Sequence, residues 1–248
     1  MMGRTHALTG GVAGLAAAPL AGATTVSQAA VFAATTAGYA LLPDLDHPSS
    51  SASRVLGWLT GLLSVLVRSI TGLIYRLTKG PRDEPGIHRT VTHTALFAVL
   101  LGAGLGYWAT TSPWVVVGIA AFGVLLAVDR LGDIAATLTA IALLVLTVGT
   151  GGDLDELVTT VDDMAWTIGI AAGLGCLTHS LGDMVTESGA PLLFPLPIAG
   201  ETYYELRPPS LLRFSTNSAV EKRIVTPLCL AVLGVLSVWT CATATAIA

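Results

Sequence analysis

The segment Thr94–Ala109 reads TALFAVLLGAGLGYWA and contains no charged residue. Its middle, Gly102–Gly106 (GAGLG), is built mostly from small residues, which let helices approach closely in lipid and suit a membrane helix better than a water-soluble one. At 16 residues the segment is shorter than the about 20 that a bilayer core needs, so flanking Thr and Ser residues must extend it. The segment therefore predicts a transmembrane helix that packs tightly against another helix.

Six further apolar stretches have the same character. They are Ala7–Gly22, Thr24–Leu42, Pro113–Val128, Ile134–Gly149, Met164–Thr178 and Ile224–Ile247. We therefore expect an all-α, polytopic membrane helical bundle with about seven spans, forming one membrane-embedded domain over residues 1–248. The stretch Val55–Leu77 differs because Arg68 and Arg76 interrupt it, which predicts an interfacial amphipathic helix or a re-entrant hairpin.

The composition of the whole chain is typical of a membrane protein. Of its 248 residues 53% are hydrophobic and 11% are charged, whereas a soluble domain carries roughly a quarter charged residues. With a net charge of −4 and only 12 Lys and Arg residues, the chain offers no basic surface for a nucleic acid, so no nucleic-acid partner is expected. Cys176, Cys229 and Cys241 lie in apolar runs without CxxC spacing, which indicates small buried side chains rather than disulfides or thiolate metal ligands.

The positive charges predict how the bundle is oriented. If the seven stretches cross the membrane and Val55–Leu77 does not, all 12 Lys and Arg residues fall on one side. Because Lys and Arg are retained on the cytoplasmic side, this side is predicted to be the cytoplasmic face of the inner or plasma membrane, with the C-terminus outside. The loop Gly152–Asp163, with five acidic residues and no basic one, fits the outer face.

The chemistry-bearing side chains fall on the same predicted side. They include all five histidines of the chain, His6, His47, His88, His93 and His179, together with Asp44, Asp46 and Asp183. Aspartate and histidine are costly beside lipid and need a partner or a cavity. Their convergence at one face therefore predicts a functional site.

The spacing of these residues favours a metal site. His179 and Asp183 are four apart, so on a helix they share one face and form a two-ligand clamp for zinc or a similar ion; a hydrogen-bonded structural pair is the alternative. His88 and His93 are five apart and can face one ion only if His88 lies in a loop, for which Thr92 is a possible helix cap.

Two further elements have two interpretations each. In Pro43–Pro48 the prolines bracket an extended turn, so Asp44 and Asp46 are expected to point the same way and either can bridge two ions, although an acidic turn without metal is also possible. Arg89 is either the counter-ion of a bound phosphate or a marker of the cytoplasmic side.

Two segments near the C-terminal part also have a structural interpretation. The apolar loop Gly189–Pro197 either lines a lipid-facing entrance or lies on the bilayer. In Thr216–Glu221, Glu221 is expected to pair with Ser218 in a capping box at the start of the last helix, a role that needs no catalysis.

Taken together, these motifs resemble those of the YdjM-like family, described as LexA-binding, inner-membrane-associated hydrolases. The resemblance is carried by Thr5-His6, PDLDH at Pro43–His47, HRTVTH at His88–His93, HSLGDMVTESG at His179–Gly189 followed by Leu192–Pro195, and TNSAVE at Thr216–Glu221. It implies a membrane-bound, metal-dependent hydrolase. The His and Asp pattern is also similar to that of zinc-dependent phospholipase C enzymes. No contact with LexA is predicted from the family's name.

We therefore predict hydrolysis of a phosphoester in a membrane lipid or lipid-linked substrate at the cytoplasmic face. The cofactor is expected to be a divalent metal, zinc first and manganese second, as one or two ions. The predicted metal ligands are His6, Asp44, Asp46, His93, His179 and Asp183, and the predicted catalytic residues are Asp46, His47, His88 and Arg89. Two alternatives stay open, a non-catalytic membrane protein with a structural or regulatory metal site, and an ion transporter.

Overall fold

The computed structural model describes residues 1–247 apart from 48–49, 51, 84–88 and 133–152. Within these residues the regular elements are helices and no strand occurs, which confirms the predicted all-α class. The α-helices are α1 (Gly3–Ala17), α2 (Val26–Tyr39), α3 (Trp58–Thr78), α4 (Ala95–Ala109), α5 (Pro113–Leu131), α7 (Leu154–Asp162), α8 (Ala165–Met184) and α9 (Thr226–Ile247). Short helical turns are η1 (Leu42–Asp46), η2 (Val91–His93), η3 (Ser210–Leu212) and η4 (Glu221–Val225).

The described helices differ in their ability to cross a membrane. Three are long and apolar enough, namely Trp58–Thr78, Pro113–Leu131 and Glu221–Ala242. Helix α4 is apolar but has only 15 residues. The predicted span Ile134–Gly149 lies outside the described residues. The count of seven spans therefore stays a prediction, and α3, which we expect at the interface, also has the length and composition of a span.

Glycine residues bring α4 and α8 into close contact, as the GAGLG sequence predicts. A Cβ atom added to Gly169 would lie 2.5 Å from the carbonyl oxygen of Gly102 and 2.5 Å from the backbone nitrogen of Gly106. One added to Gly173 would lie 2.8 Å from the carbonyl oxygen of Ala98. Both helices thus carry two glycines four residues apart, and any side chain at these positions would force the backbones apart.

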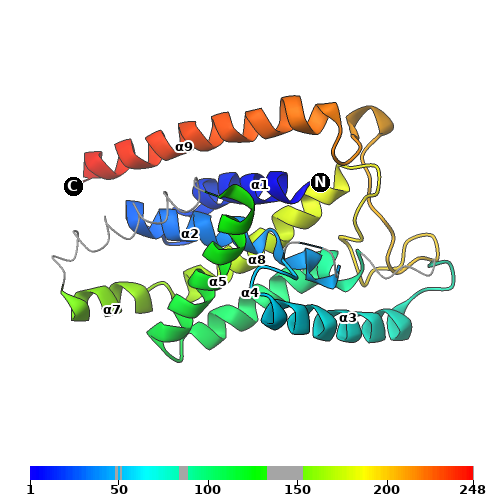
Figure 1. The fold of residues 1–248 in the computed structure, drawn as a ribbon, viewed down its shortest axis with the longest axis horizontal. Helices are drawn as coiled ribbons and strands as arrows, with labels where there is room; N and C mark the ends of the chain where they lie inside the picture. Colours follow the sequence, from blue (N-terminus) through cyan, green and yellow to red (C-terminus); the bar gives the residue numbers. More distant parts are fainter. Residues whose placement is uncertain (48–49, 51, 84–88, 133–152, 248) are drawn as a thin grey trace.

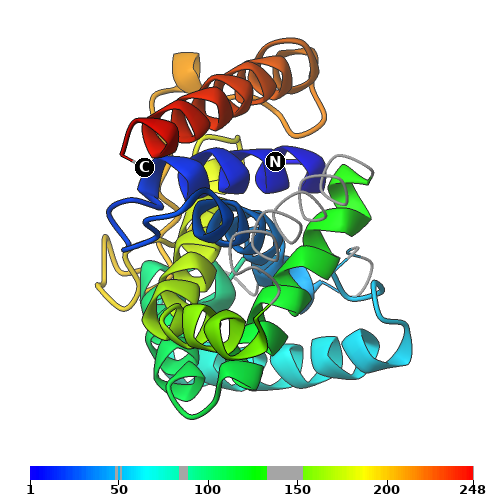
Figure 2. The ribbon, with the colours of Figure 1, turned by 90° about the vertical axis from the view of Figure 1, so that its left-hand side faces the viewer.

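Helix α8 lies at the centre of the bundle and contacts α1, α2 and α4. Helix α9 runs along one edge of the molecule beside α1, and α3 lies at the opposite edge, where it contacts η1 and η2 (Figures 1 and 2). Helices α1 and α2 also meet through small residues, because a Cβ atom on Gly14 would lie 2.6 Å from the Cα atom of Ala33. This arrangement brings the start of α1, η1, η2 and the end of α8 together, where the polar residues gather.

Candidate metal centre

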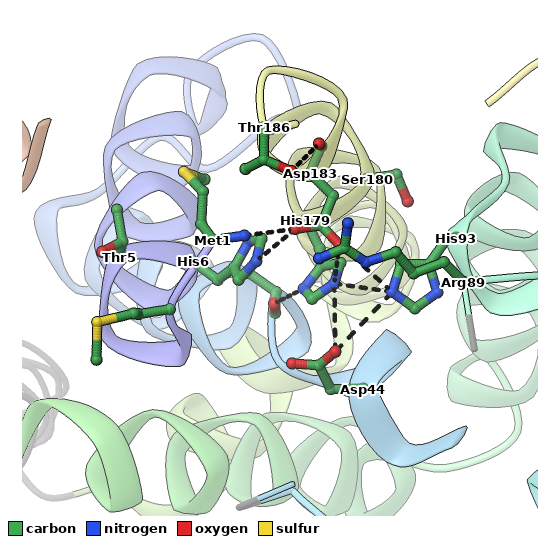
Figure 3. A network of polar contacts seen from close by, with 12 residues as sticks. Met1, Thr5, His6, Asp44, Arg89, His93, His179, Ser180, Asp183 and Thr186 are labelled. Atoms are coloured by element: carbon green, nitrogen blue, oxygen red, sulfur yellow. Dashed lines mark hydrogen bonds and ion pairs between the residues drawn. The ribbon is translucent and has the colours of Figure 1, made fainter. Parts of the chain in front are cut away.

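Four ligand atoms converge between η1, η2 and α8 (Figure 3). The Nε2 atom of His93 lies 3.2 Å from Nε2 of His179, 3.7 Å from Oδ2 of Asp183 and 3.9 Å from Oδ1 of Asp44. The Nε2 atom of His179 lies 3.6 Å from Oδ2 of Asp183 and 3.7 Å from Oδ1 of Asp44. Four ligands placed about 2.1 Å from a zinc ion are about 3.4 Å apart in a tetrahedron, so these five separations suit ligands of such an ion.

The orientation of the His179 ring is fixed by a backbone contact on the side away from the other ligand atoms. Its Nδ1 atom lies 2.7 Å from the carbonyl oxygen of Ala40 at the end of α2. Because a carbonyl oxygen only accepts, Nδ1 donates the hydrogen and Nε2 keeps its lone pair toward the other ligand atoms. His179 and Asp183 both lie on α8 with their side chains buried, and they share one face as their spacing predicts.

His93 is placed by the turn η2, which precedes α4. The N-cap of α4 is Thr94, whose hydroxyl accepts a hydrogen bond at 3.0 Å, and not Thr92 as the sequence suggested, because the α-helix begins only after η2. Thr92 instead donates to Oδ2 of Asp46 at 2.9 Å, and its hydroxyl lies 3.0 Å from Nδ1 of His93. Burial and the neighbouring His179 lower the pKa of His93 to about 3, so this imidazole is neutral at physiological pH.

The two aspartates of PDLDH point to different places, so the expected extended turn is wrong. Leu42–Asp46 forms a 3₁₀-helix, which tolerates Pro43 in its first turn. At three residues per turn, side chains two apart diverge by about 120°. Asp44 therefore reaches His93 and His179, whereas Oδ2 of Asp46 lies 3.7 Å from the other ring nitrogen of His93.

The exposure of Asp44 gives the site an open side. Its side chain is 27% exposed, whereas that of His93 is fully buried. Burial raises the pKa of Asp44, but the nearby histidines, His179 first, lower it more, and the net pKa of Asp44 lies below its ordinary value. Asp44 is thus an ionised carboxylate at the edge of the group.

His6 adds a fifth side chain from the first turns of α1. Its ring stacks on that of His179 with centroids 3.8 Å apart, and its Nε2 lies 3.2 Å from Oδ1 of Asp183. The side chain is fully buried, and Nδ1 has no hydrogen-bond partner. A buried imidazole nitrogen that faces a carboxylate oxygen is a suitable metal ligand. Gly182 leaves room for the ring, since a Cβ atom there would lie 3.3 Å from it.

His179 belongs to both candidate ligand groups, which are His6–His179–Asp183 and Asp44–His93–His179, and Asp183 of the first group also faces His93 of the second. Its Oδ1 atom accepts from the amino group of Met1 at 2.5 Å and faces His6. Its Oδ2 atom lies 3.0 Å from Nε of Arg89 and faces His93 and His179. With one oxygen toward His6 and the other toward His93 and His179, Asp183 would be the carboxylate shared by two ions if two were bound, a role that the sequence analysis gave to Asp44 or Asp46.

The remaining predicted residues lie outside these groups. Arg89 holds a left-handed backbone conformation, with φ of 62°, and its guanidinium also donates to the carbonyl oxygen of Gly189 at 3.4 Å. His47 is half-buried just after η1 and belongs to neither group of ligand atoms, and His88 lies outside the described residues. Sequence reasoning missed the contribution of Thr92, although its place directly before His93 is a signal that could have indicated it.

Comparison with known proteins adds one finding. A family model described as YdjM inner membrane protein matches residues 1–247, which include every residue of the candidate metal centre. No curated protein matches the chain, and no solved structure matches it.

Proposed function

Because the chain belongs to the YdjM family of inner membrane proteins, we propose that it is a metal-dependent hydrolase acting on a phosphoester of a lipid or lipid-linked substrate. The observation that carries the proposal is the pair of Nε2 atoms of His93 and His179, which lie 3.2 Å apart. A carboxylate oxygen of Asp44 and one of Asp183 each lie within 3.9 Å of both nitrogens. The Nε2 atom of His6, which lies 3.2 Å from Oδ1 of Asp183, extends this set toward a second position. Imidazole and carboxylate together favour zinc, with manganese as the second choice.

The residues of the chain have distinct roles in this proposal. A bound divalent ion supplies Lewis-acid polarisation of a phosphoryl oxygen and lowers the pKa of water. His93, His179, Asp44 and Asp183 would hold that ion, with His6 on the far side of Asp183. Arg89 keeps Asp183 in place, and because its side chain is 15% exposed it can also bind a phosphate oxygen.

Proton transfer and substrate approach are assigned to the open side of the site. Asp44 is the exposed member of the group, so a substrate reaches the ligands past its carboxylate. We propose His47, half-buried just after η1, as an acid or base there, with His88 as the other candidate and Asp46 as the group that orients His93.

The geometry also supports the proposed membrane placement. Asp44 precedes α3 and His93 follows it, yet their ligand atoms are 3.9 Å apart. Helix α3 has 21 residues and is about 31 Å long, so crossing the bilayer would send its two flanks to opposite sides. We therefore propose that α3 lies at the interface, that about seven other helices span the membrane, and that the site faces the cytoplasm with the C-terminus outside.

The experiment measures metal content and phosphodiesterase activity of detergent-purified protein. The test variant is His179→Ala/Asp183→Ala, and the matched control is Glu205→Ala, which removes an exposed carboxylate outside both ligand groups. We expect near-stoichiometric zinc or manganese and cleavage of a generic phosphodiester in the wild type and the control, and neither in the test variant.

Other results would overturn the proposal in distinct ways. Bound metal without cleavage of any phosphoester would indicate a structural or regulatory site. Metal flux into proteoliposomes without ester cleavage would indicate a transporter. Absence of metal from the wild type would exclude both the hydrolase and the metal site.

A further inference from the structure

Glu221, at the start of the last helical segment, is a buried carboxylate outside the metal centre. It is fully buried, whereas the next two residues, Lys222 and Arg223, are exposed. Its Oε1 accepts a hydrogen bond from the backbone nitrogen of Met2 at 2.6 Å, and its Oε2 accepts one from that of Asn217 at 2.7 Å. The expected capping box is only half formed, because Ser218 accepts from the nitrogen of Glu221 at 3.4 Å while the carboxylate bonds elsewhere.

Helix α1 has no cap of its own that could replace Glu221. Met2 is its N-cap residue, makes no side-chain capping bond, and is followed by no acidic residue in the first turn. The first N–H groups of a helix need acceptors and favour a negative charge nearby. Glu221 provides both from a position 219 residues away in the sequence.

The backbone around Glu221 is fixed by an unusual turn. Glu221–Val225 is a π-helix, in which the N–H and the hydroxyl of Thr226 both donate to the carbonyl oxygen of Glu221. The same hydroxyl lies 3.3 Å from that of Thr5 on α1. Isolated π-turns are rare and are found frequently at functional sites. Two contacts therefore attach the beginning of α1 to this turn. Met2 contacts Glu221 before the first helical residues, and Thr5 contacts Thr226 after them.

The residue that depends on this attachment is His6. It follows Thr5 directly, its ring stacks on that of His179 and fits the space at Gly182, and its Nε2 lies 3.2 Å from Oδ1 of Asp183. We propose that Glu221 is a positioning residue, which fixes the start of α1 so that the imidazole of His6 faces Asp183 and His179. The metal role of His6 rests on the proposed function, whereas its placement by Glu221 can be measured without metal.

The first arm of the test is metal-free and uses the full chain with ¹³C-labelled histidine in detergent. Because the ring of His6 stacks at 3.8 Å on that of His179, its Hε1 resonance is shifted by the neighbouring ring, and His6→Ala assigns it. Glu221→Ala is expected to abolish this shift, and Glu221→Gln, which keeps one acceptor oxygen, to reduce it. The control Glu205→Gln, an exposed glutamate, should leave it unchanged. An unchanged resonance in a folded Glu221→Ala variant would overturn the proposal.

The second arm measures Co²⁺ affinity in a double-mutant cycle of His6→Ala and Glu221→Ala. We expect Glu221→Ala to weaken binding about tenfold, as for groups that orient metal ligands, and the double variant to bind as weakly as His6→Ala alone. Additive losses would overturn the proposal, since Glu221 would then act independently of His6. If Glu221→Ala does not fold, Glu221→Gln takes its place in the cycle. If the wild type binds no Co²⁺, the proposed function fails, and the resonance of His6 alone decides the positioning role.

Discussion

Replacing Gly173 by alanine is predicted to weaken metal binding from a distance. The added Cβ atom would lie 2.8 Å from the carbonyl oxygen of Ala98, whereas ordinary contacts begin at 3.4 Å. The obstacle is backbone, so α8 and α4 must separate by about 0.6 Å at this point. Gly173 lies six residues before His179 and Ala98 lies five after His93, so the separation acts on the pair of ligand nitrogens that are 3.2 Å apart.

The expected loss of metal affinity follows from the narrow range of ligand distances that a metal site tolerates. Ligand distances must agree with their ideal values within about 0.2 Å, so a displacement of about 0.6 Å exceeds the tolerance about threefold. We expect the affinity for Co²⁺ or Zn²⁺ to fall about 10–100-fold, as for other changes that misplace ligands. Overpacking should destabilise the fold by about 1–3 kcal/mol, partly offset by up to about 1 kcal/mol of helix propensity.

The assay compares Gly173→Ala with Gly104→Ala in detergent. Gly104 lies on α4 with no atom within 4 Å of an added Cβ, so its variant gains helix propensity without a collision. Metal affinity is measured by competition with a chelating dye, and melting temperature by intrinsic fluorescence. The reasoning is refuted if Gly173→Ala binds metal as tightly as Gly104→Ala, because the packing of α4 on α8 would then have no part in placing the ligands.

Three further outcomes test the site itself. Thr92→Val, which loses the hydrogen bond to Asp46, should lower metal affinity about 10–100-fold in the same dye competition, whereas Thr110→Val on the exposed end of α4 should not. Arg89→Lys keeps the charge but loses the forked donor, so metal content should persist while phosphodiester turnover falls about 100-fold; equal turnover would remove Arg89 from the mechanism. Zinc at 100 times its Kd should raise the free energy of unfolding by about 2.7 kcal/mol, seen as a higher melting temperature that a chelator reverses and that His179→Ala/Asp183→Ala does not show.

The parts of the fold that depend on local spacing were predictable from the sequence. The glycines of GAGLG indicated a close helix contact, and the structure places Gly102 against Gly169 and Gly173 on α8. The four-residue spacing of His179 and Asp183 required only that the segment be helical. Such patterns are local, so they do not depend on which other segments are neighbours.

The features that could not be predicted from the sequence depend on a competition between local conformations or on long-range contacts. The two prolines that bracket DLDH, at positions 43 and 48, are compatible with an extended turn and with a 3₁₀-helix. Packing against α3 and α8 selects the helix that separates Asp44 from Asp46. The bond from Glu221 to Met2 joins residues 219 apart, so a nearby serine was the only partner that spacing could suggest. For the same reason the stack of His6 on His179 could not be read from either motif.

The position of the candidate metal centre is explained by the cost of burying charge in a membrane. Ionisable side chains are costly within the bilayer, so ligands are tolerated where helices begin and end. His6 lies in the first turns of α1, His93 directly before α4, and Asp183 at the end of α8. A group built from helix ends keeps its geometry only if the helices cannot slide past one another, and the glycine contacts between α4 and α8 provide that restraint. The small-residue interfaces of this chain are therefore part of its site, which is why substitutions remote from the ligands should change metal affinity.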